Sequence, residues 1–586
     1  MSAPPTIPAQ PCTIYGRVSA PPTISVQPCT IYRSDGGIGA TKRWITLGCA
    51  KNVGGADIGV RAVAGLGGGP VPCRALPRAS LPYHSRMDPP AGRDQIAPPV
   101  TAALTFVAAA CVLVLEIAAG RLLAPYVGVS LTTYTGIIGA ILAGIALGAW
   151  LGGRAADAIR PQALLGPTFV LGGLAAIAAV PIVAALGPLG LGDGFVAIVT
   201  LATVAFVAPA AILSAVGPML VRATLTDVAT SGSIVGRLSA IGTAGAISGT
   251  FLTGFVLLGI VPTRVLIVAV GGLLVVIGLG LSVVLRAGSG PRTGVLALAA
   301  LLSGGLAVTG PSPCDTESAY YCIAVRLDPD NANGRILVLD RLTHAYVDLI
   351  DPTTIEFAYV RRFADVSAPY LDSLDRPVDV LHVGGGGFSF PRYLEATRPV
   401  ARQTVLELDP VVLQVARQQL GFVRNDTIEV IVGDARRSIE GLPDDAFDLV
   451  IGDAFGGLAV PWHLTTVEFL DQIERVLRPG GTYVANLIDY PPLGFVRAEA
   501  ATAATRFRHV AIISGRATLA GESGGNVVLV ASDTPLDVAA VTSRIAKWGG
   551  TAPTGILADP AEVAAFIGDA PVLTDDFAPV DQLLGR

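Results

Sequence analysis

The stretch VDVLHVGGGGFSF, residues 378–390 of a chain of 586 residues, decides the fold class. A short apolar run ends there in four consecutive glycines, Gly384 to Gly387, and a helix-like segment follows. A second apolar run, QTVLELD, ends on Glu407 and Asp409 about twenty residues later, the spacing at which a Rossmann-type sheet places an acid that grips ribose hydroxyls. The pattern therefore predicts an α/β sheet that binds a nucleoside.

Strand-like and helix-like segments continue to alternate along this region. We expect strands at residues 378–383, 403–408, 427–432, 447–452 and 482–488. Such alternation is typical of a mostly parallel sheet, whose ligands bind outside the carboxyl ends of the strands. The residues at those ends are Gly384 to Gly387, Glu407, Asp409, Asp434 and Asp453, and we expect them to converge on one site.

The chemistry of these side chains fits a bound nucleoside. Glycines let the backbone approach a ligand closely. Glu407 or Asp409 can accept hydrogen bonds from both ribose hydroxyls, and Asp434 in the VGDA segment can accept one from the exocyclic amine of an adenine. The run VGGGGFSF lacks the third glycine of the G-x-G-x-x-G fingerprint at its proper spacing, so a dinucleotide is the less favoured ligand.

A succession of apolar stretches precedes this region, each near the ~20 residues that a bilayer crossing requires. The expected spans are 100–118, 132–151, 163–186, 194–216, 236–258, 262–285 and a weaker 294–309. They predict a multi-pass protein of the cell membrane, with the lipid bilayer as a partner. Arginines follow the even-numbered spans, which places the N-terminus in the cytoplasm. The side that holds the C-terminal domain stays open, because it depends on whether the seventh span crosses.

A carboxylate inside hydrocarbon is costly, and Glu116 lies within the first span. Arg121 follows five positions later and is a candidate ion-pair partner for it. We therefore expect a structural pair here, with a transport role as the alternative.

The first residues of the chain differ from everything that follows. SAPPTIPAQPCTIYGRV (2–18) is repeated at once as SAPPTISVQPCTIYRSD (19–35), rich in Pro and Thr and without a hydrophobic period. We expect residues 1–97 to be a low-complexity extension without a packed core. Met87 directly precedes the first apolar span, so translation could start at Met1 or at Met87.

Charge divides the chain in two. Residues 1–310 carry 18 Lys and Arg against 8 Asp and Glu, whereas residues 311–586 carry 22 against 37. The acidic C-terminal part suits a small cationic amine substrate and argues against nucleic acid, whose phosphates it would repel. The seven cysteines form no metal-ligand pattern. Cys314 and Cys322 bracket a short loop and would pair if that loop faces an oxidising compartment.

These observations predict a multi-span α-helical membrane domain followed by a Rossmann-like domain. Two β-rich runs, AYYCIAVRLD and GRILVLD, are joined by the turn segment DNANG and predict a small β-hairpin subdomain between the two. We expect the domains 1–97 (extension), 98–310 (about seven helices), 311–370 (β-rich subdomain) and 371–586 (Rossmann-like domain).

From about Glu317 to Leu493 the chain resembles spermidine synthases, the polyamine aminopropyltransferases, in their membrane-fused bacterial form. LVLDRLTHAY is similar to the family's LDG…Q segment, with His344 in place of Gln, and FAYVRRF matches its tyrosine segment through Tyr359. VGGGGFSFPRYL resembles the GGGDGG loop, LELD the ribose-binding strand, VGDA the adenine segment and DLVIGDAFGG the DSSDP segment. The apolar part also resembles the fused N-terminal region, in AGRLLAPYVG, LGAWLGGRAAD and GPMLVRA.

The resemblance implies transfer of the aminopropyl group of decarboxylated S-adenosylmethionine to putrescine, giving spermidine and methylthioadenosine, with no further cofactor and no metal. It implies that Asp453 orients and deprotonates the attacking amine and that Tyr359 assists it. The co-substrate is expected to lie against Gly384, Gly385, Gly386, Glu407, Asp409, Asp434, Ala435 and His344. A homo-oligomer is compatible with the resemblance.

Three positions depart from the family pattern. Gly387 and Gly456 stand where the family has acidic residues that face the amines, and Arg361 replaces an acid in the tyrosine segment. Each missing charged hydrogen bond weakens recognition of a diamine by about 1 to 3 kcal/mol. Two alternatives therefore stay open, namely a membrane-bound S-adenosylmethionine-dependent methyltransferase and a transporter or sensor with a nucleoside-binding domain.

Overall fold

A computed structural model describes residues 96–586 apart from gaps at 191–193, 226, 286–303, 306, 308, 424–425, 549–552 and 586. It also describes two short strands, β1 (Gln27–Thr30) and β2 (Thr46–Cys49), which pair in antiparallel fashion. Residues 1–88 form a unit separate from 89–586. Most of the expected extension, residues 1–97, thus lies outside the described residues.

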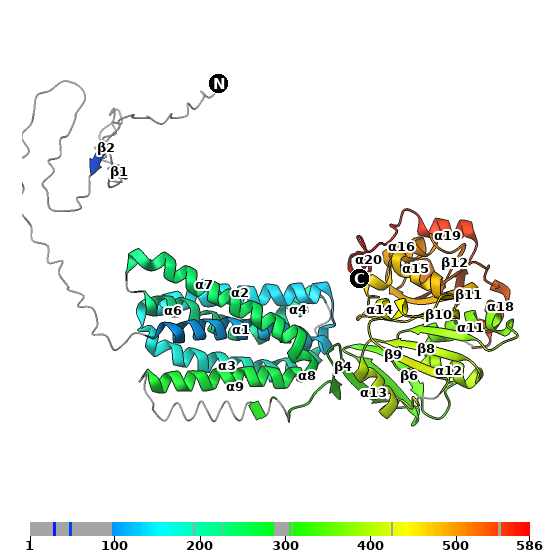
Figure 1. The fold of residues 1–586 in the computed structure, drawn as a ribbon, viewed down its shortest axis with the longest axis horizontal. Helices are drawn as coiled ribbons and strands as arrows, with labels where there is room; N and C mark the ends of the chain where they lie inside the picture. Colours follow the sequence, from blue (N-terminus) through cyan, green and yellow to red (C-terminus); the bar gives the residue numbers. More distant parts are fainter. Residues whose placement is uncertain are drawn as a thin grey trace, which may run out of the picture. The chain divides into compact units, whose positions relative to one another are not determined.

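Six helical spans come first in the described part of the larger unit (Figure 1). Each is long and apolar enough to cross a membrane, with mean hydropathies between 1.6 and 2.7. Their elements are α1 (Pro98–Val127), α2 (Leu131–Ala158), α3 (Pro161–Leu186), η1 (Gly187–Leu189), α4 (Phe195–Ala202), η2 (Thr203–Val207), α5 (Ala208–Ser214), α6 (Val216–Thr224), η3 (Val228–Thr230), α7 (Ser231–Leu252), η4 (Thr253–Leu257), α8 (Leu258–Ile260) and α9 (Thr263–Val284). The weaker seventh span, 294–309, falls mainly outside the described residues.

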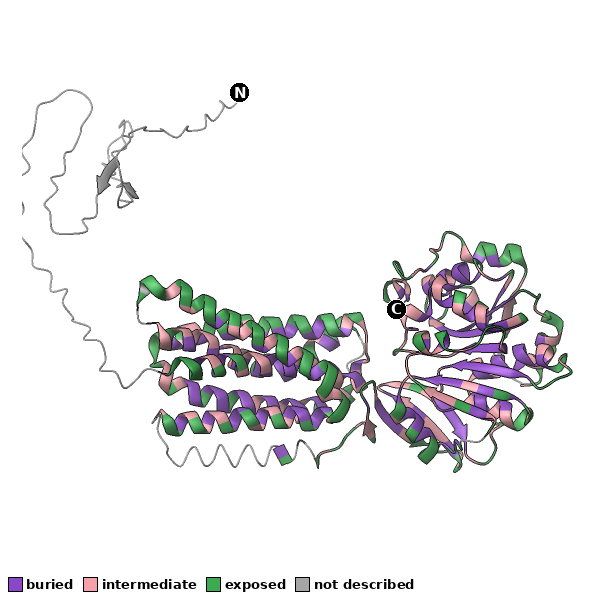
Figure 2. Cartoon of the chain, viewed as in Figure 1, coloured by how far each residue is buried: buried purple, intermediate pink, exposed green. Residues whose placement is uncertain are grey.

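Small residues let these helices pack closely. A side chain at Gly148 of α2 would meet the Ala211 carbonyl oxygen of α5 at 1.9 Å, and one at Gly245 of α7 would meet the Phe106 oxygen of α1 at 2.3 Å. Close backbone approach of this kind is how apolar helices associate where water supplies no driving force. Apolar residues such as Phe255, 82% exposed, lie on the outside of the helices, and Figure 2 shows exposed residues along the helices.

The expected pair between Glu116 and Arg121 is wrong. The Arg121 guanidinium donates instead to the backbone oxygens of Ser318, at 2.9 Å, and of Tyr320. The Arg121 side chain thereby joins α1 to the segment that leads into the C-terminal sheets. Glu116 stays half-buried on α1.

The C-terminal domain is built on an eight-stranded sheet with the order β14-β12-β13-β11-β10-β7-β8-β9. Strands β7 to β11 are parallel, and β12 to β14 add antiparallel strands at one edge. The bounds are β7 (Asp379–Val383), β8 (Arg402–Glu407), β9 (Ile428–Val432), β10 (Phe447–Gly452), β11 (Leu477–Asp489), β12 (His509–Gly515), β13 (Gly525–Ser532) and β14 (Thr554–Leu557). The Rossmann-like fold predicted from the sequence is confirmed.

Helices cover both faces of this sheet (Figure 1). Alternate residues of one strand enter different cores: Val380 packs with α11, α12 and α18, while Leu381 packs with α14, α15, α16 and α19. The helices are α11 (Ala358–Asp372), α12 (Ser389–Thr397), α13 (Pro410–Gln419), α14 (Ala435–Glu440), η5 (Trp462–Leu464), α15 (Val467–Val476), α16 (Gly494–Ala503), α17 (Arg516–Leu519), α18 (Val538–Ala546), α19 (Pro560–Ile567) and α20 (Val580–Leu583). Burial on both faces explains why the central strands are continuous apolar runs.

A four-stranded antiparallel sheet precedes this domain, with the order β3 (Thr316–Glu317), β4 (Cys322–Leu327), β5 (Gly334–Leu339) and β6 (Leu342–Asp348). The predicted hairpin corresponds to β4 and β5. Cys314 and Cys322 form a disulfide, so the pairing considered from the sequence is present. Ile323 and Val347 of this sheet pack against Phe388, which directly follows the glycine run. The small sheet is thereby held against the carboxyl ends of the main strands.

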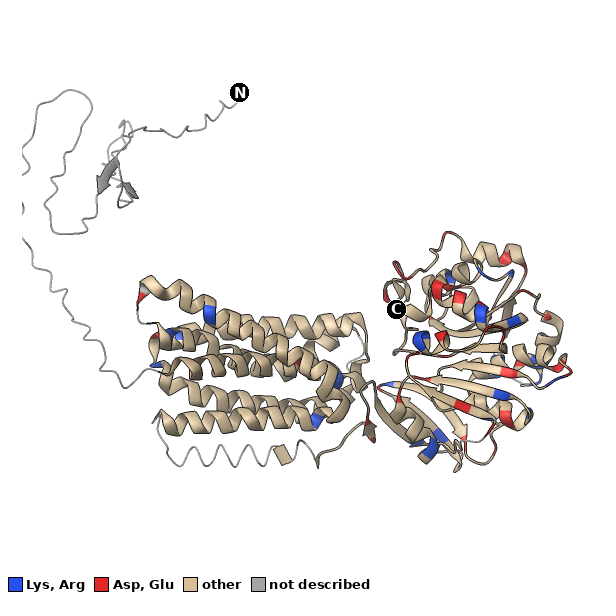
Figure 3. Cartoon of the chain, viewed as in Figure 1, with Lys and Arg blue, Asp and Glu red and all other residues tan. Residues whose placement is uncertain are grey.

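Charged residues are distributed unequally between the apolar helices and the C-terminal domain. Figure 3 shows few charged residues along the apolar helices and residues of both signs throughout the C-terminal domain.

Candidate active site

The glycine run forms the turn between β7 and α12. Gly384 has φ of +104°, and a Cβ atom there would lie 2.4 Å from the backbone oxygen of Asp453. Gly386 also has a positive φ, +50°. Gly384 therefore requires glycine, whereas Gly386 has open space for a Cβ atom, and the close approach at Gly384 joins the end of β7 to the end of β10.

Glu407, the last residue of β8, fastens this turn. One carboxylate oxygen accepts the amides of Gly385 and Gly386, each at 2.9 Å, and the other accepts the Asp409 amide at 2.8 Å. Burial raises the pKa of Glu407, and these amide hydrogen bonds oppose the shift. A carboxylate offers about four lone-pair positions. Three are used, so the oxygen that faces Asp409 keeps one for a ligand hydroxyl.

The Asp409 carboxylate, in contrast, hydrogen-bonds within the protein. It is fully buried, caps α13 by accepting the Val411 amide at 2.8 Å, and accepts a hydrogen bond from the Ser318 hydroxyl. No oxygen of Asp409 lines a described cavity, so the ribose role expected for Asp409 is corrected to a structural one. The reason is local: the carboxylate of an N-cap residue turns back to the helix that it begins.

Asp434 and Ala435 begin α14 and line the same cavity as the glycine turn and Glu407. Asp434 accepts the Arg437 amide at 3.2 Å through one oxygen and lies 3.1 Å from Nε2 of His463 through the other. His463, on η5, was not predicted from the sequence, because 29 residues separate it from Asp434. We call this space, about 260 Å³ in volume, the nucleoside cavity.

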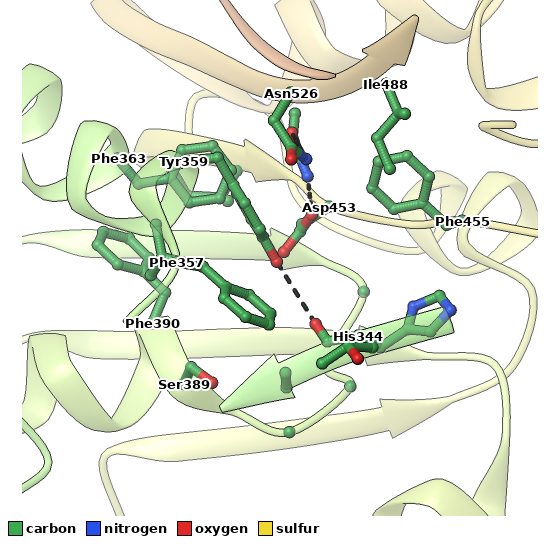
Figure 4. A pocket seen from close by; sticks show the side chains of 18 of the residues that line it. His344, Phe357, Tyr359, Phe363, Ser389, Phe390, Asp453, Phe455, Ile488 and Asn526 are labelled. Carbon is green, nitrogen blue, oxygen red and sulfur yellow. Dashed lines mark hydrogen bonds between the residues drawn. The ribbon is translucent and has the colours of Figure 1, made fainter. Parts of the chain in front are cut away.

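A second space of about 380 Å³ adjoins the first, and we call it the acceptor cavity. Asp453, His344, Phe455 and Gly384 to Gly386 line both cavities. The second cavity is also lined by the aromatic side chains of Phe357, which precedes α11, of Phe363 on α11 and of Phe390 on α12 (Figure 4). Asp453 therefore lies where a nucleoside-bound group and a second substrate would meet.

Asp453 is held by a chain of side-chain hydrogen bonds. The Asn486 amide donates to its Oδ1 at 3.0 Å, and the Asn526 amide donates in turn to the Asn486 oxygen at 3.0 Å. Burial raises the pKa of Asp453 to about 6, while the hydrogen bonds from Asn486 and Tyr359 lower it. A base whose pKa lies this close to neutral is suited to accept a proton from a substrate.

Tyr359 extends from α11 into the acceptor cavity and faces Asp453 (Figure 4). Its hydroxyl lies 3.5 Å from the backbone oxygen of His344 and hydrogen-bonds with the Asp453 carboxylate. Burial and the charge of Asp453 raise the Tyr359 pKa well above its ordinary value. The phenol therefore stays protonated and acts as a donor.

His344 lies on β6 and lines both cavities. Burial lowers its pKa to about 4, so its ring is neutral near pH 7. A neutral imidazole offers one donor and one acceptor, as a glutamine amide does. This explains in chemical terms how His344 can stand at the position where the resembling family carries Gln.

The three departures from the family pattern have different surroundings. A Cβ atom at Gly387 would lie 2.4 Å from the Ala345 Cβ, so an acid there requires the backbone to shift. At Gly456 the nearest atom would be 3.7 Å away, which leaves room. Arg361 lies 3.7 Å from the Glu356 carboxylate and stacks over Trp548. The acceptor cavity therefore has only Asp453 and Glu356 as carboxylates among its lining residues.

Within the described residues, no group of three His, Cys, Asp or Glu side chains could hold a metal ion. The predicted residues are brought together with the single exception of Asp409.

The fold and the site define a Rossmann-like domain of the methyltransferase type. Residues 381–485 match the family model described as a methyltransferase domain. That match covers β7 to β11, the strands that carry the glycine turn, Glu407, Asp434 and Asp453.

Individual proteins of similar sequence give a more specific comparison. The chain is 37% identical over 113 residues to a polyamine aminopropyltransferase of Vibrio vulnificus, which covers 19% of this chain and 38% of that protein. It is 33% identical over 127 residues to the eEF1A lysine and N-terminal methyltransferase of Danio rerio, covering 20% and 18%. A probable spermidine synthase from Corynebacterium glutamicum has 29% identity and a TM-score of 0.43, covering 46% of this chain and 99% of that one. The matched stretch thus spans 38% or less of these two curated relatives. The predicted resemblance to polyamine aminopropyltransferases is confirmed over this stretch.

Proposed function

We propose that the C-terminal domain transfers an aminopropyl group from decarboxylated S-adenosylmethionine to a primary amine. The observation that carries the proposal is Asp453, a carboxylate with a raised pKa that is oriented by Asn486 and Tyr359 where the two cavities meet. Relatives named polyamine aminopropyltransferase support the same reaction.

The donor would occupy the nucleoside cavity. The remaining acceptor position of Glu407 suits a ribose hydroxyl, and Asp434 with Ala435 borders the space for the base. The glycine turn allows the sulfonium group to approach Asp453, because Gly384 already lies against its backbone. His344, neutral and placed between the cavities, would hydrogen-bond the donor.

In the reaction, the ammonium form of the acceptor loses a proton to Asp453. The freed nitrogen lone pair forms a bond to the methylene carbon beside the sulfonium, and the carbon–sulfur bond breaks with its electrons left on sulfur. The products are the aminopropylated amine and neutral methylthioadenosine. Because the sulfonium is already activated, the protein contributes mainly alignment and the base.

Putrescine is the acceptor that the resemblance implies, with spermidine as product, and serves as the reference substrate. Relatives named eEF1A lysine and N-terminal methyltransferase, together with the methyltransferase family model, favour a second candidate, methyl transfer from S-adenosylmethionine. The missing acids at Gly387 and Gly456 support that candidate as well, because a methyl acceptor needs no second carboxylate.

We further propose the domain division 98–310 and 311–586, with a β-rich subdomain over 311–370 and a Rossmann-like domain over 371–586. The six apolar helices support a multi-pass location in the cell membrane. The acidic C-terminal part favours a cationic small molecule over nucleic acid, and a homo-oligomer is compatible with this arrangement.

The test uses the full chain in phosphatidylcholine nanodiscs with putrescine and either donor. Release of methylthioadenosine from decarboxylated S-adenosylmethionine is expected, with little S-adenosylhomocysteine from the ordinary donor. Turnover of S-adenosylmethionine alone, with any amine, would replace the proposal by the methyltransferase candidate.

A further inference from the structure

A third cavity, about 570 Å³ in volume, lies beside the acceptor cavity. One wall comes from the connection after α1 and the start of α4, including Val127, Val129 and Phe195. The other comes from Leu339 to Leu342 and from Gly456 to Ala459. We call it the membrane-side cavity, because its first wall lies at the ends of helices that are apolar enough to cross a bilayer.

The membrane-side and acceptor cavities share Leu342, His344, Gly457 and Leu458 in their linings. Gly457 has φ of +106°, and a Cβ atom there would lie 3.2 Å from the Val129 backbone oxygen. The loop after β10, which begins with Asp453, thus rests on the connection between α1 and α2. A substrate in the membrane-side cavity is one layer of residues from the base.

Hydrogen bonds fix this arrangement. The backbone amide of Thr263, at the start of α9, donates to the Glu317 carboxylate at 2.8 Å, and Arg264 donates to the Gly310 oxygen at 3.1 Å. Arg121 of α1 donates to the Ser318 oxygen at 2.9 Å. These hydrogen bonds tie α1 and α9 to the segment 310–318, and the approach of Gly457 to Val129 lies at the cavity itself.

The lining of the membrane-side cavity combines apolar side chains with acids. Val127, Phe195, Leu339 and Leu458 are apolar, while Asp340 and Asp581 supply carboxylates beside one cation, Arg341. An amine on an apolar chain satisfies both kinds of surface. A short diamine fits less well, because it would leave the apolar side chains of Val127, Phe195, Leu339 and Leu458 without an apolar contact.

The acceptor cavity points to the same chemistry. It lacks an acid at Gly387, where the Ala345 side chain closes the space into which an acid would project, and its second carboxylate, Glu356, is paired with Arg361 at 3.7 Å. We infer that the acceptor is a primary amine on a single apolar chain, which enters from the bilayer through the membrane-side cavity and presents its nitrogen to Asp453. The inference rests on the proposed aminopropyl transfer for its reaction, and on the cavity for its substrate.

The first experiment compares acceptors. The full chain in nanodiscs of phosphatidylcholine, a lipid without a primary amine, receives decarboxylated S-adenosylmethionine with butylamine, putrescine or dodecylamine, and release without added amine is subtracted. We expect kcat/KM for methylthioadenosine release to be at least tenfold higher with dodecylamine than with either short amine. Equal or lower values overturn the inference. Release from nanodiscs containing phosphatidylethanolamine, without added amine, would identify a lipid headgroup as acceptor and overturn the single-chain assignment.

A matched pair of variants tests whether a preference for dodecylamine comes from binding in the cavity or only from its enrichment in the lipid. Phe195 lines the cavity, while its neighbour Val196 lies at the same helix start, is 76% exposed and does not line it. Phe195→Glu is expected to lower the ratio of dodecylamine to butylamine kcat/KM at least fivefold, and Val196→Glu to leave the ratio within twofold of the parent. Equal ratios in both variants contradict the inference.

A labelling experiment keeps the inference separate from the proposed function. A long-chain alkylamine with a diazirine at its chain end is expected to label the peptides that contain residues 127–130 or 456–459, and dodecylamine is expected to block this. Such labelling without any methylthioadenosine release would reject aminopropyl transfer but support the membrane-side cavity as a binding site for an amine on an apolar chain. Labelling elsewhere, or labelling that dodecylamine leaves unchanged, would reject the site itself.

Discussion

The donor half and the acceptor half of the site differ in how far they keep the features of the resembling family. On the donor side, the glycine turn, Glu407 and Asp434 border one cavity. On the acceptor side, Asp453 and Tyr359 remain, but Gly387 and Gly456 replace acids. Under the proposed function, this difference predicts that the nucleoside donor and the base are retained while recognition of the acceptor has changed.

The largest expected effect concerns Asp453, which belongs to both halves. Asp453→Asn keeps the shape of the side chain but removes the base, so turnover should fall by ~10² to 10⁴, the contribution of a positioned general base. Binding of methylthioadenosine, measured by calorimetry, should change less than twofold. The exposed Asp569→Asn is the matched control. Near-normal turnover of Asp453→Asn would exclude this aspartate as the base.

Substitutions in the donor half should weaken the binding of the nucleoside rather than slow the chemical step. Glu407→Ala and Asp434→Ala each remove a charged hydrogen-bond acceptor worth ~1.5 to 3 kcal/mol, so methylthioadenosine affinity should fall at least tenfold. Glu407→Ala also releases the Gly385 and Gly386 amides, which adds to the loss. Calorimetric titration measures both variants, with the exposed Glu440→Ala as control. Unchanged affinity in both would remove the proposed nucleoside cavity.

A third prediction uses pH. Asp453 must be unprotonated to act, and its pKa is about 6, so kcat/KM should fall about tenfold per pH unit below that value and level off above it. Asn486 stabilises the charged carboxylate by donating to it, so Asn486→Ala should raise the pKa of Asp453. The fall of kcat/KM at low pH, the acidic limb of the profile, should then move to higher pH. Tyr359→Phe should move it in the same direction. A limb that does not move in either variant contradicts the hydrogen-bonded arrangement around Asp453.

Much of the fold could be predicted because the apolar pattern is unambiguous. The expected strands 378–383 and 447–452 correspond to β7 (Asp379–Val383) and β10 (Phe447–Gly452), since strands buried on both faces are short apolar runs between turns. The six described spans also follow the expected ones. Here sequence and structure agree because the signal is local.

The parts that could not be predicted depend on contacts between distant segments. Asn486 orders Asp453 from 33 residues away, Asn526 orders Asn486 from a further 40 residues away, and neither lies in a recognisable motif. Asp409 looks equivalent to Glu407 in the sequence, but it turns to cap α13. Arg121 was assigned to Glu116 by proximity along the chain, whereas its partners, Ser318 and Tyr320, come from the segment before β4.

The smallest expected effect tests whether the acceptor half can be returned to the family pattern. Gly456 has open space around its Cβ position, with the nearest atom at 3.7 Å, so Gly456→Asp can add a carboxylate without displacing the loop. A partly exposed charged hydrogen bond of ~1 kcal/mol corresponds to about a fivefold gain, which should appear as a lower KM for putrescine with little change in kcat. Steady-state release of methylthioadenosine measures both constants.

Gly387→Asp is the informative contrast to Gly456→Asp, because its Cβ atom would lie 2.4 Å from that of Ala345. It should lower the melting temperature without improving putrescine use. If Gly387→Asp improves KM as much as Gly456→Asp does, the space beside Ala345 is open in solution and steric closure does not explain the missing acid. If Gly456→Asp leaves KM unchanged while butylamine and putrescine react equally well, the second ammonium makes no contact near this loop, and the amine on an apolar chain is the better description of the acceptor.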